Sequence, residues 1–89
     1  MDSSTFIEKC KKLVAEYTNN YMDKSDAQTI TENDTFVVWS CKTLQNNKAL
    51  LSTINSDGMY YEITYNGDKK EFYLDAYKKF ENRCIKEKE

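Results

Sequence analysis

The chain has 89 residues, which is enough for one domain but too few for two. Hydrophobic residues make up 39% of it and aromatic residues 13%, a mixture that favours a packed core over disorder. The 13 basic and 15 acidic side chains leave a net charge of −2, which argues against a protein that simply clamps a polyanion. No apolar run approaches the roughly 20 residues that a membrane-spanning helix needs, and the polar N-terminus lacks a secretory signal pattern.

The composition also excludes most catalytic motifs. Histidine is absent, so neither a Ser-His-Asp triad nor a Cys-His pair can form, and the two glycines are too few for a nucleotide-binding loop. Acidic pairs occur in a polar stretch, where nothing raises a carboxyl pKa for acid catalysis. The sequence therefore predicts a non-enzymatic protein with no catalytic residue, no cofactor and no metal site. A carboxylate or tyrosine active centre stays open as an alternative.

Three widely spaced cysteines indicate a reducing compartment. Cys10, Cys41 and Cys84 are odd in number and form no CxxC pattern, which fits neither a disulfide framework nor a zinc site. Each has apolar neighbours at core-like spacing, so we expect three buried, reduced thiols in a cytoplasmic protein.

Residues 3–22 have the pattern of an amphipathic helix, because apolar side chains recur every three or four residues along one stripe. Thr5 and Glu8 have the spacing of a capping box at its start. The stripe consists of Phe6, Ile7, Cys10, Leu13, Val14, Tyr17 and Tyr21.

Residues 35–65 predict a three-stranded antiparallel meander, because β-branched and aromatic residues alternate with turn signals. Turns at 46–47 and 56–57 set its register: the first pairs Trp39 with Ile54, and the second pairs Ile54 with Met59. The expected strands are 35–43, 49–54 and 59–65. The inward face in this register consists of Val37, Trp39, Cys41, Leu50, Ile54, Met59, Tyr61, Ile63 and Tyr65.

The last part of the chain predicts a second helix, over residues 74–86. Tyr73, Ala76, Tyr77, Phe80 and Cys84 follow three-and-four spacing, and basic residues gather where the helix dipole favours them. Residues 69–73 stay open between the first helical turn and a short fourth strand after the turn signal Asn66-Gly67.

Together these elements predict an α+β fold. It is a two-layer α-β-β-β-α sandwich, in which two helices cover one face of a three-stranded antiparallel meander. We expect a single domain over residues 1–89, with a mobile polar connector at 23–34 and a frayed tail at 87–89. Both edges of the sheet stay open to partners.

The outer face of the predicted sheet is not simply polar. Monomers rarely expose large contiguous apolar patches without a use, so we interpret this face as a surface for a protein partner or a second copy. Partial cover by the 23–34 connector is the alternative. The candidate partner-binding residues are Phe36, Val38, Lys42, Leu51, Tyr60 and Glu62.

Four stretches resemble small, uncharacterised phage and prophage proteins of Gram-positive bacteria. They are FIEKCKKLV at 6–14, VVWSCKTLQNNKALLST at 37–53, DGMYYEITYNGDK at 57–69 and YLDAYKKFEN at 73–82. This resemblance brings no activity with it. It implies a phage accessory protein that acts in the cytoplasm of the bacterial host.

The sequence thus favours a small interaction protein that binds and modulates a host or phage protein, for instance as an inhibitor of a host defence or metabolic protein. A homodimer through the outer face or a strand edge is compatible with it, whereas a membrane partner is not expected. The alternative function is a nucleic-acid-binding accessory protein, with stacking aromatics beside Lys42, although the charge balance disfavours it.

Overall fold

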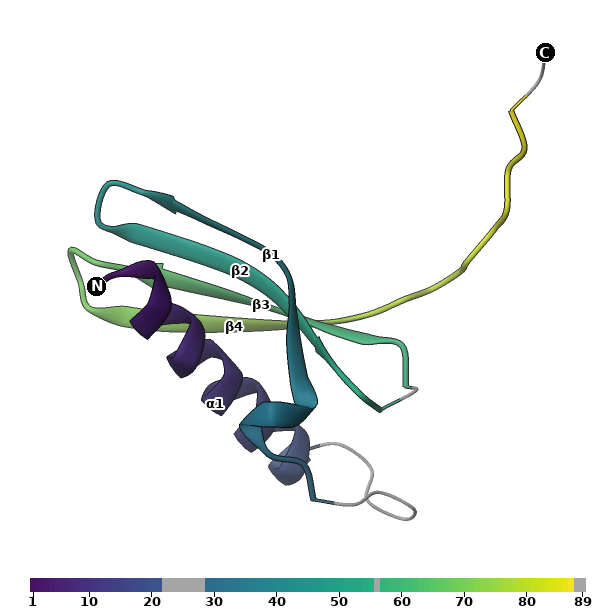
Figure 1. The fold of residues 1–89 in the computed structure, drawn as a ribbon, viewed down its shortest axis with the longest axis horizontal. Coiled ribbons are helices and arrows are strands. Elements are labelled where there is room, and N and C mark those ends of the chain that lie inside the picture. Colours follow the sequence, from purple (N-terminus) through teal and green to yellow (C-terminus); the bar gives the residue numbers. More distant parts are fainter. Residues whose placement is uncertain (22–28, 56, 88–89) are drawn as a thin grey trace.

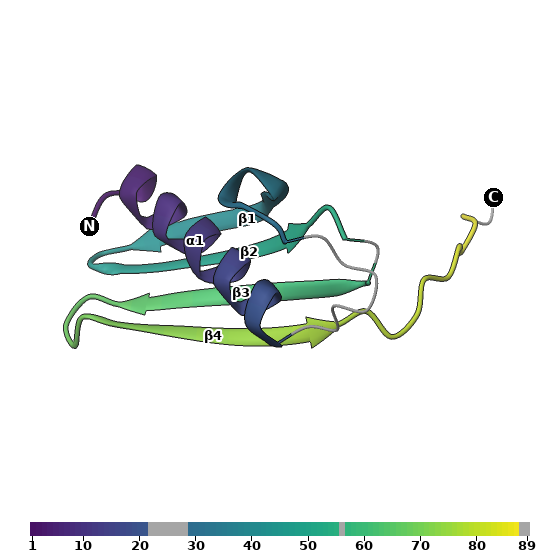
Figure 2. The same ribbon diagram turned by 90° about the horizontal axis from the view of Figure 1, so that it is seen from below.

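The computed structural model describes residues 1–21, 29–55 and 57–87. One long helix is followed by a four-stranded antiparallel sheet whose strands lie in chain order, β1-β2-β3-β4 (Figures 1 and 2). The elements are α1 (Ser3–Tyr21), the short 3-10 helix η1 (Glu32–Asp34), β1 (Thr35–Thr43), β2 (Asn46–Thr53), β3 (Met59–Asn66) and β4 (Glu71–Lys78). The α+β class is as predicted, but the described residues form one long helix rather than two, and four strands rather than three.

Helix α1 begins at an aspartate cap. The Asp2 carboxylate accepts a hydrogen bond of 2.7 Å from the backbone N–H of Thr5, which satisfies one of the free donors of the first turn. This contact lowers the pKa of the Asp2 carboxyl. The predicted capping box between Thr5 and Glu8 is therefore wrong, because Asp2 already occupies the capping position.

The apolar stripe of α1 packs across one face of the sheet, and this contact forms the core (Figure 2). Phe6, Cys10 and Val14 repeat every four residues, and all three are buried. They meet a buried layer from the two central strands, consisting of Ala49, Leu51, Tyr61, Ile63 and Tyr65. The rings of Tyr17 and Tyr61 meet edge to face at 5.6 Å, which extends the core towards the end of the helix.

The chain returns from α1 to the sheet through one anchored residue. Ile30 is buried, and the side-chain amide of Asn19 on α1 bonds both its backbone N–H, at 2.9 Å, and its carbonyl, at 2.8 Å. The predicted 23–34 connector is therefore tied down at its C-terminal part. Its residues 23–28 lie outside the described residues, so the expected mobility stays a prediction.

The register of the sheet differs from the predicted one. The first turn lies at Leu44-Gln45, so Trp39 pairs with Leu50 rather than with Ile54. Between β2 and β3, Leu51 pairs with Tyr61, a shift of one residue from the prediction. Because side chains alternate across a strand, this shift turns Leu51 into the core and Leu50 out of it.

The two hairpin ends support one another. The side chain of Asn46 accepts a hydrogen bond of 3.0 Å from the backbone N–H of Gly67, and the Gln45 amide donates to Asp68 at 2.6 Å. A side chain at Gly67 would collide with the carbonyl oxygen of Gln45, which explains the glycine at this position. The turn signal at Asn66-Gly67 is therefore confirmed, and it leads into a fourth strand.

The predicted helix over residues 74–86 is wrong. Glu71–Lys78 form β4, which pairs antiparallel with β3 from Asn66↔Glu71 to Met59↔Lys78. Of the two readings left open for residues 69–73, the strand is the correct one. Phe72 and Leu74 face α1, and the ring of Phe72 lies 4.7 Å from that of Tyr65 and 6.4 Å from that of Phe6. These contacts are available only to a strand that lies beside β3.

Neighbouring leucines on β2 give a direct test of the register. Leu51 is fully buried, so Leu51→Ala should lower the free energy of unfolding by about 2–5 kcal/mol. Leu50 lies half-buried on the other side of the sheet, and Leu50→Ala should cost only about 1 kcal/mol. Urea titration followed by circular dichroism measures both; a larger loss for Leu50→Ala would restore the predicted register.

Candidate functional site

The side of the sheet away from α1, here called the open face, is the candidate site. Residues paired across strands share a face, so the partners of half-buried Leu50 lie on this side and those of buried Leu51 on the other. Nothing within residues 1–21, 29–55 and 57–87 covers it (Figures 1 and 2). The open face includes Phe36, Trp39, Cys41, Lys48, Leu50, Ser52, Tyr60, Glu62, Thr64, Glu71, Tyr73, Asp75 and Tyr77.

Aromatic rings dominate this face. Phe36, Trp39, Tyr73 and Tyr77 each expose between 41% and 52% of their surface. A buried aromatic residue removes about 150–250 Å² from water, so four half-exposed rings present about 300–500 Å². Phe36 and Trp39 lie on one edge strand, β1, and Tyr73 and Tyr77 lie on the other, β4, so this area is divided between two parts of the face with β2 and β3 between them.

A β-bulge in β1 brings the tryptophan to the open face. Val37 pairs with the buried Leu51, whereas Trp39 pairs with Leu50, so Val38 is an extra residue without a partner on β2. The extra residue shifts the alternation by one, and Trp39 turns away from α1. Without the bulge, the side chain of Trp39 would point towards the helix.

The charges on the open face are unevenly distributed. The Lys48 ammonium lies 3.5 Å from the Glu62 carboxylate on the next strand, which pairs two of the charges. Asp75 lies opposite Glu62 on β4, and Glu71 lies at the start of that strand. The Tyr73 hydroxyl donates a hydrogen bond to Glu71, and this contact raises the pKa of Tyr73. The half of the open face formed by β3 and β4 is therefore acidic.

The structure separates the six predicted partner-binding residues. Phe36, Tyr60 and Glu62 lie on the open face, and Val38 lies exposed in the bulge at its edge. Leu51 is fully buried beneath α1, so its assignment to the outer face is wrong.

Lys42 lies on the side of α1, where its ammonium donates a hydrogen bond of 2.9 Å to the Met1 carbonyl. Its assignment to the outer face is therefore also wrong. Both errors have one cause, because the bulge and the shifted register invert the alternation at these two positions.

Three aromatic residues of the open face were not predicted. Trp39 was assigned to the core, and it instead exposes 41% of its surface. Tyr77 falls in the predicted helix and Tyr73 in the stretch left open between helix and strand, and their alternation with Phe72 and Leu74 is the sequence signal that could have revealed them.

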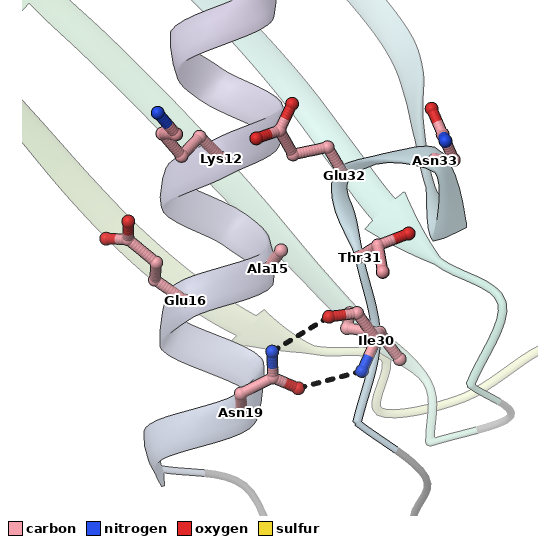
Figure 3. A pocket seen from close by; sticks show the side chains of 8 residues that line it. All are labelled: Lys12, Ala15, Glu16, Asn19, Ile30, Thr31, Glu32 and Asn33. Atoms are coloured by element: carbon pink, nitrogen blue, oxygen red, sulfur yellow. Dashed lines mark hydrogen bonds between the residues drawn. The ribbon is translucent and has the colours of Figure 1, made fainter.

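A groove with a volume of about 330 Å³ lies between α1 and η1, apart from the open face (Figure 3). Asn19 reaches from α1 to Ile30 across one end of it, and both groups of its amide are used in that contact. Lys12, Glu16 and Glu32 border the rest with exposed charges. This groove therefore holds the chain return against the helix, and its polar amide is not free for a ligand.

Only one cysteine is buried as predicted. Cys10 lies in the core, and burial raises the pKa of its thiol to about 12. Cys41 on the open face and Cys84 near the C-terminus are exposed, so the expectation of burial is wrong for both. The apolar residues near Cys41 belong to the open face and those near Cys84 to an extended segment, so neither group belongs to the core.

Among the described residues, no three side chains of the metal-ligating types lie close enough to hold an ion. The same part of the chain includes no helix that is both long and apolar enough to cross a bilayer.

The fold and site define a class of protein: a small α+β domain with one helix-covered sheet face and one exposed aromatic face. Residues 7–87 match a family of unknown function, DUF6275, and the chain belongs to this family. No curated protein and no solved structure matches it. The site must therefore be interpreted from its own chemistry.

The three thiols should differ in reactivity. In the native protein at pH 8, a maleimide should label Cys41 and Cys84 rapidly and leave Cys10 unmodified, because a buried thiol with a raised pKa forms little thiolate. Peptide mass spectrometry after labelling measures each site, and unfolding in guanidinium should release Cys10. Rapid native labelling of Cys10 would contradict the assigned core.

Proposed function

We propose that this protein is a non-enzymatic interaction protein that binds another protein across its open face. The observation that carries this proposal is the set of half-exposed rings along the two edges of the open face, Phe36 and Trp39 on β1 and Tyr73 and Tyr77 on β4. Tyrosine and tryptophan dominate the energetic centres of protein interfaces, because they bury much area and lose little conformational freedom. A rigid antiparallel sheet holds these rings in place before a partner arrives, which lowers the entropic cost of binding.

The charge distribution limits the kind of partner. Glu62, Asp75 and Glu71 surround the rings on β3 and β4, and Lys48 is already close to Glu62. A complementary protein surface would place apolar side chains over the rings and basic groups over the β3–β4 half. The partner is therefore a protein with an apolar patch that has a basic rim.

The resemblance to phage and prophage proteins supports a biological setting for this binding. The protein would act in the cytoplasm of a bacterial host, where it binds and modulates a host or phage protein. An inhibitor of a host defence or metabolic protein is one form of this role.

A nucleic-acid-binding function is the second candidate, and the same rings favour it. Four-stranded sheets with exposed aromatic residues stack single-stranded bases in several RNA-binding folds. Such sheets also need cations for the phosphates, and the open face offers Lys48 and, beside Tyr60 at its end, Lys79 against three carboxylates. Lys42, which was expected to supply a cation beside the rings, lies on the other side of the sheet. The charges thus favour a protein partner.

Substitution of two rings should abolish partner capture. We expect the double variant Trp39→Ser and Tyr73→Ser to lose at least about tenfold of the wild-type capture of specific proteins from host or infected-cell lysate, because both side chains are half-exposed on the open face. Quantitative mass spectrometry of the captured proteins gives the measurement.

The matched control carries Lys12→Ala and Glu16→Ala, two exposed positions on the outer surface of α1, and should capture the same proteins as wild type. Capture that survives in the ring variant, or fails equally in the control, would show that the open face is not the binding surface.

Fluorescence anisotropy separates the two candidate functions. With labelled single-stranded DNA and RNA at low salt, we expect no saturable binding, since the open face has more carboxylates than cations. Saturable binding that disappears with Trp39→Ser and weakens steeply with added salt would favour the nucleic-acid function instead.

A further inference from the structure

The edge strand β4 continues into an exposed segment. In the described part of the chain, β4 pairs with β3 on one side and with nothing on the other. Beyond Lys78, residues 79–87, here called the C-terminal arm, run clear of the body in extended form (Figure 1). Phe80 is fully exposed and Ile85 is 83% exposed, which is costly for an isolated chain in water.

Backbone hydrogen bonds show which groups of β4 are available. The N–H of Lys79 donates to the Gly58 carbonyl at 2.7 Å, so the pairing with β3 continues one residue past β4. In an antiparallel ladder, alternate residues point their backbone groups to opposite sides. Odd-numbered residues of β4 therefore bond to β3, and the even-numbered ones from 72 to 80 present unpaired groups to the free edge. Such a row is a template for another strand.

We propose that β4 and the C-terminal arm pair antiparallel with the same segment of a second copy, about a two-fold axis at Tyr77. A two-fold axis perpendicular to the sheet keeps the open faces of both copies on the same side. Because only the even-numbered residues present backbone groups to this edge, even-numbered residues must lie opposite even-numbered ones and odd-numbered opposite odd-numbered. Each allowed register is therefore centred on a single residue. This restriction leaves few registers to compare.

Charge selects one register among them. With the axis at Tyr77, Asp75 lies opposite Lys79 of the second copy and Glu71 lies opposite Arg83, and each pair occurs twice by symmetry. Directly opposite charges of unlike sign stabilise a strand pair, and those of like sign destabilise it. The same register places Leu74 opposite Phe80, so the exposed ring gains an apolar neighbour.

The neighbouring registers all place like charges together. An axis at Asp75 sets that carboxylate against itself, and an axis at Ala76 sets Glu71 against Glu81. An axis at Lys78 sets this ammonium against itself. In the single chain, the Arg83 guanidinium lies 2.8 Å from the Glu81 carboxylate of the same arm. Because this ion pair is exposed, replacing it by a pair with Glu71 of the second copy costs little free energy.

The dimer would join two sheets into one of eight strands. The two Tyr77 rings would meet as a cross-strand pair on the open face, and the two aromatic faces would become continuous. This inference rests on the edge and the arm alone, so it holds or fails independently of the partner proposed for the open face.

A cysteine pair at the axis tests both the contact and its register. In a Cys41→Ser and Cys84→Ser background, Tyr77→Cys should form a disulfide-linked dimer in a glutathione buffer. Residue 77 would lie opposite itself in a pair without backbone hydrogen bonds, where the Cα atoms are about 4.5 Å apart, within the range that a disulfide spans. Tyr73→Cys is the matched control, since Tyr73 is similarly exposed but lies opposite residue 81, and it should stay monomeric.

Charge exchange tests the same register without a covalent bond. Sedimentation equilibrium should find a reversible dimer in the wild type, and Asp75→Lys or Lys79→Asp alone should raise its dissociation constant about tenfold or more. The double variant Asp75→Lys with Lys79→Asp should restore the dimer, which also shows that both substitutions are compatible with folding. A wild type that stays monomeric up to its solubility limit, equal crosslinking at positions 73 and 77, or a double variant that stays dissociated would overturn the proposal.

Discussion

One helix of 19 residues has to bury one face of a four-stranded sheet, and the rest of the molecule follows from this constraint. The stripe of Phe6, Cys10 and Val14 covers the central strands, where Leu51, Tyr61 and Ile63 lose all contact with water. Besides the three-residue η1, the described part of the chain has no second helix to place on the other side. The alternation of the strands therefore decides which side chains lie uncovered on that side, and in this sequence they include five aromatic residues.

A one-residue choice of register decides which side chains these are. Val37 and Trp39 both lie in β1 two residues apart, a spacing that would normally put them on the same face. The bulge at Val38 separates them, so Val37 joins the core and Trp39 joins the open face. Bulges are common at sheet edges, where they turn a side chain to the other face of the sheet. Here the residue that changes face is the single tryptophan of the chain.

The sequence predicted those features that local chemistry determines. Helix α1 was visible because its apolar residues repeat at helical spacing, and β1 because Val, Phe, Trp and Thr favour strands. The first turn was misplaced because Asn46-Asn47 is the stronger turn signal, whereas Leu44 adopts the positive φ of 56° without any local sign of it. No short-range pattern marks the bulge either, since it depends on how β1 fits against β2.

The prediction of a helix over residues 74–86 was wrong for a related reason. Residues 72–80 fit both periods: Tyr73, Tyr77 and Phe80 recur at helical spacing, while Phe72, Leu74 and Ala76 alternate as in a strand. The choice between them is made by β3, which offers a full edge of backbone partners, and by Tyr65 and Phe6, which offer a site for the ring of Phe72. Two of the four half-exposed rings, Tyr73 and Tyr77, could therefore be assigned to the open face only from the tertiary pairing.

The proposed binding surface requires Trp39 to lie at the open face, and tryptophan fluorescence tests this directly because the chain has one tryptophan. In the free protein, acrylamide should quench the emission much more efficiently than that of a buried indole, because Trp39 exposes 41% of its surface, and a bound partner should protect it. A blue-shifted emission that resists acrylamide in the free protein would place Trp39 in the core and contradict the structure of the open face.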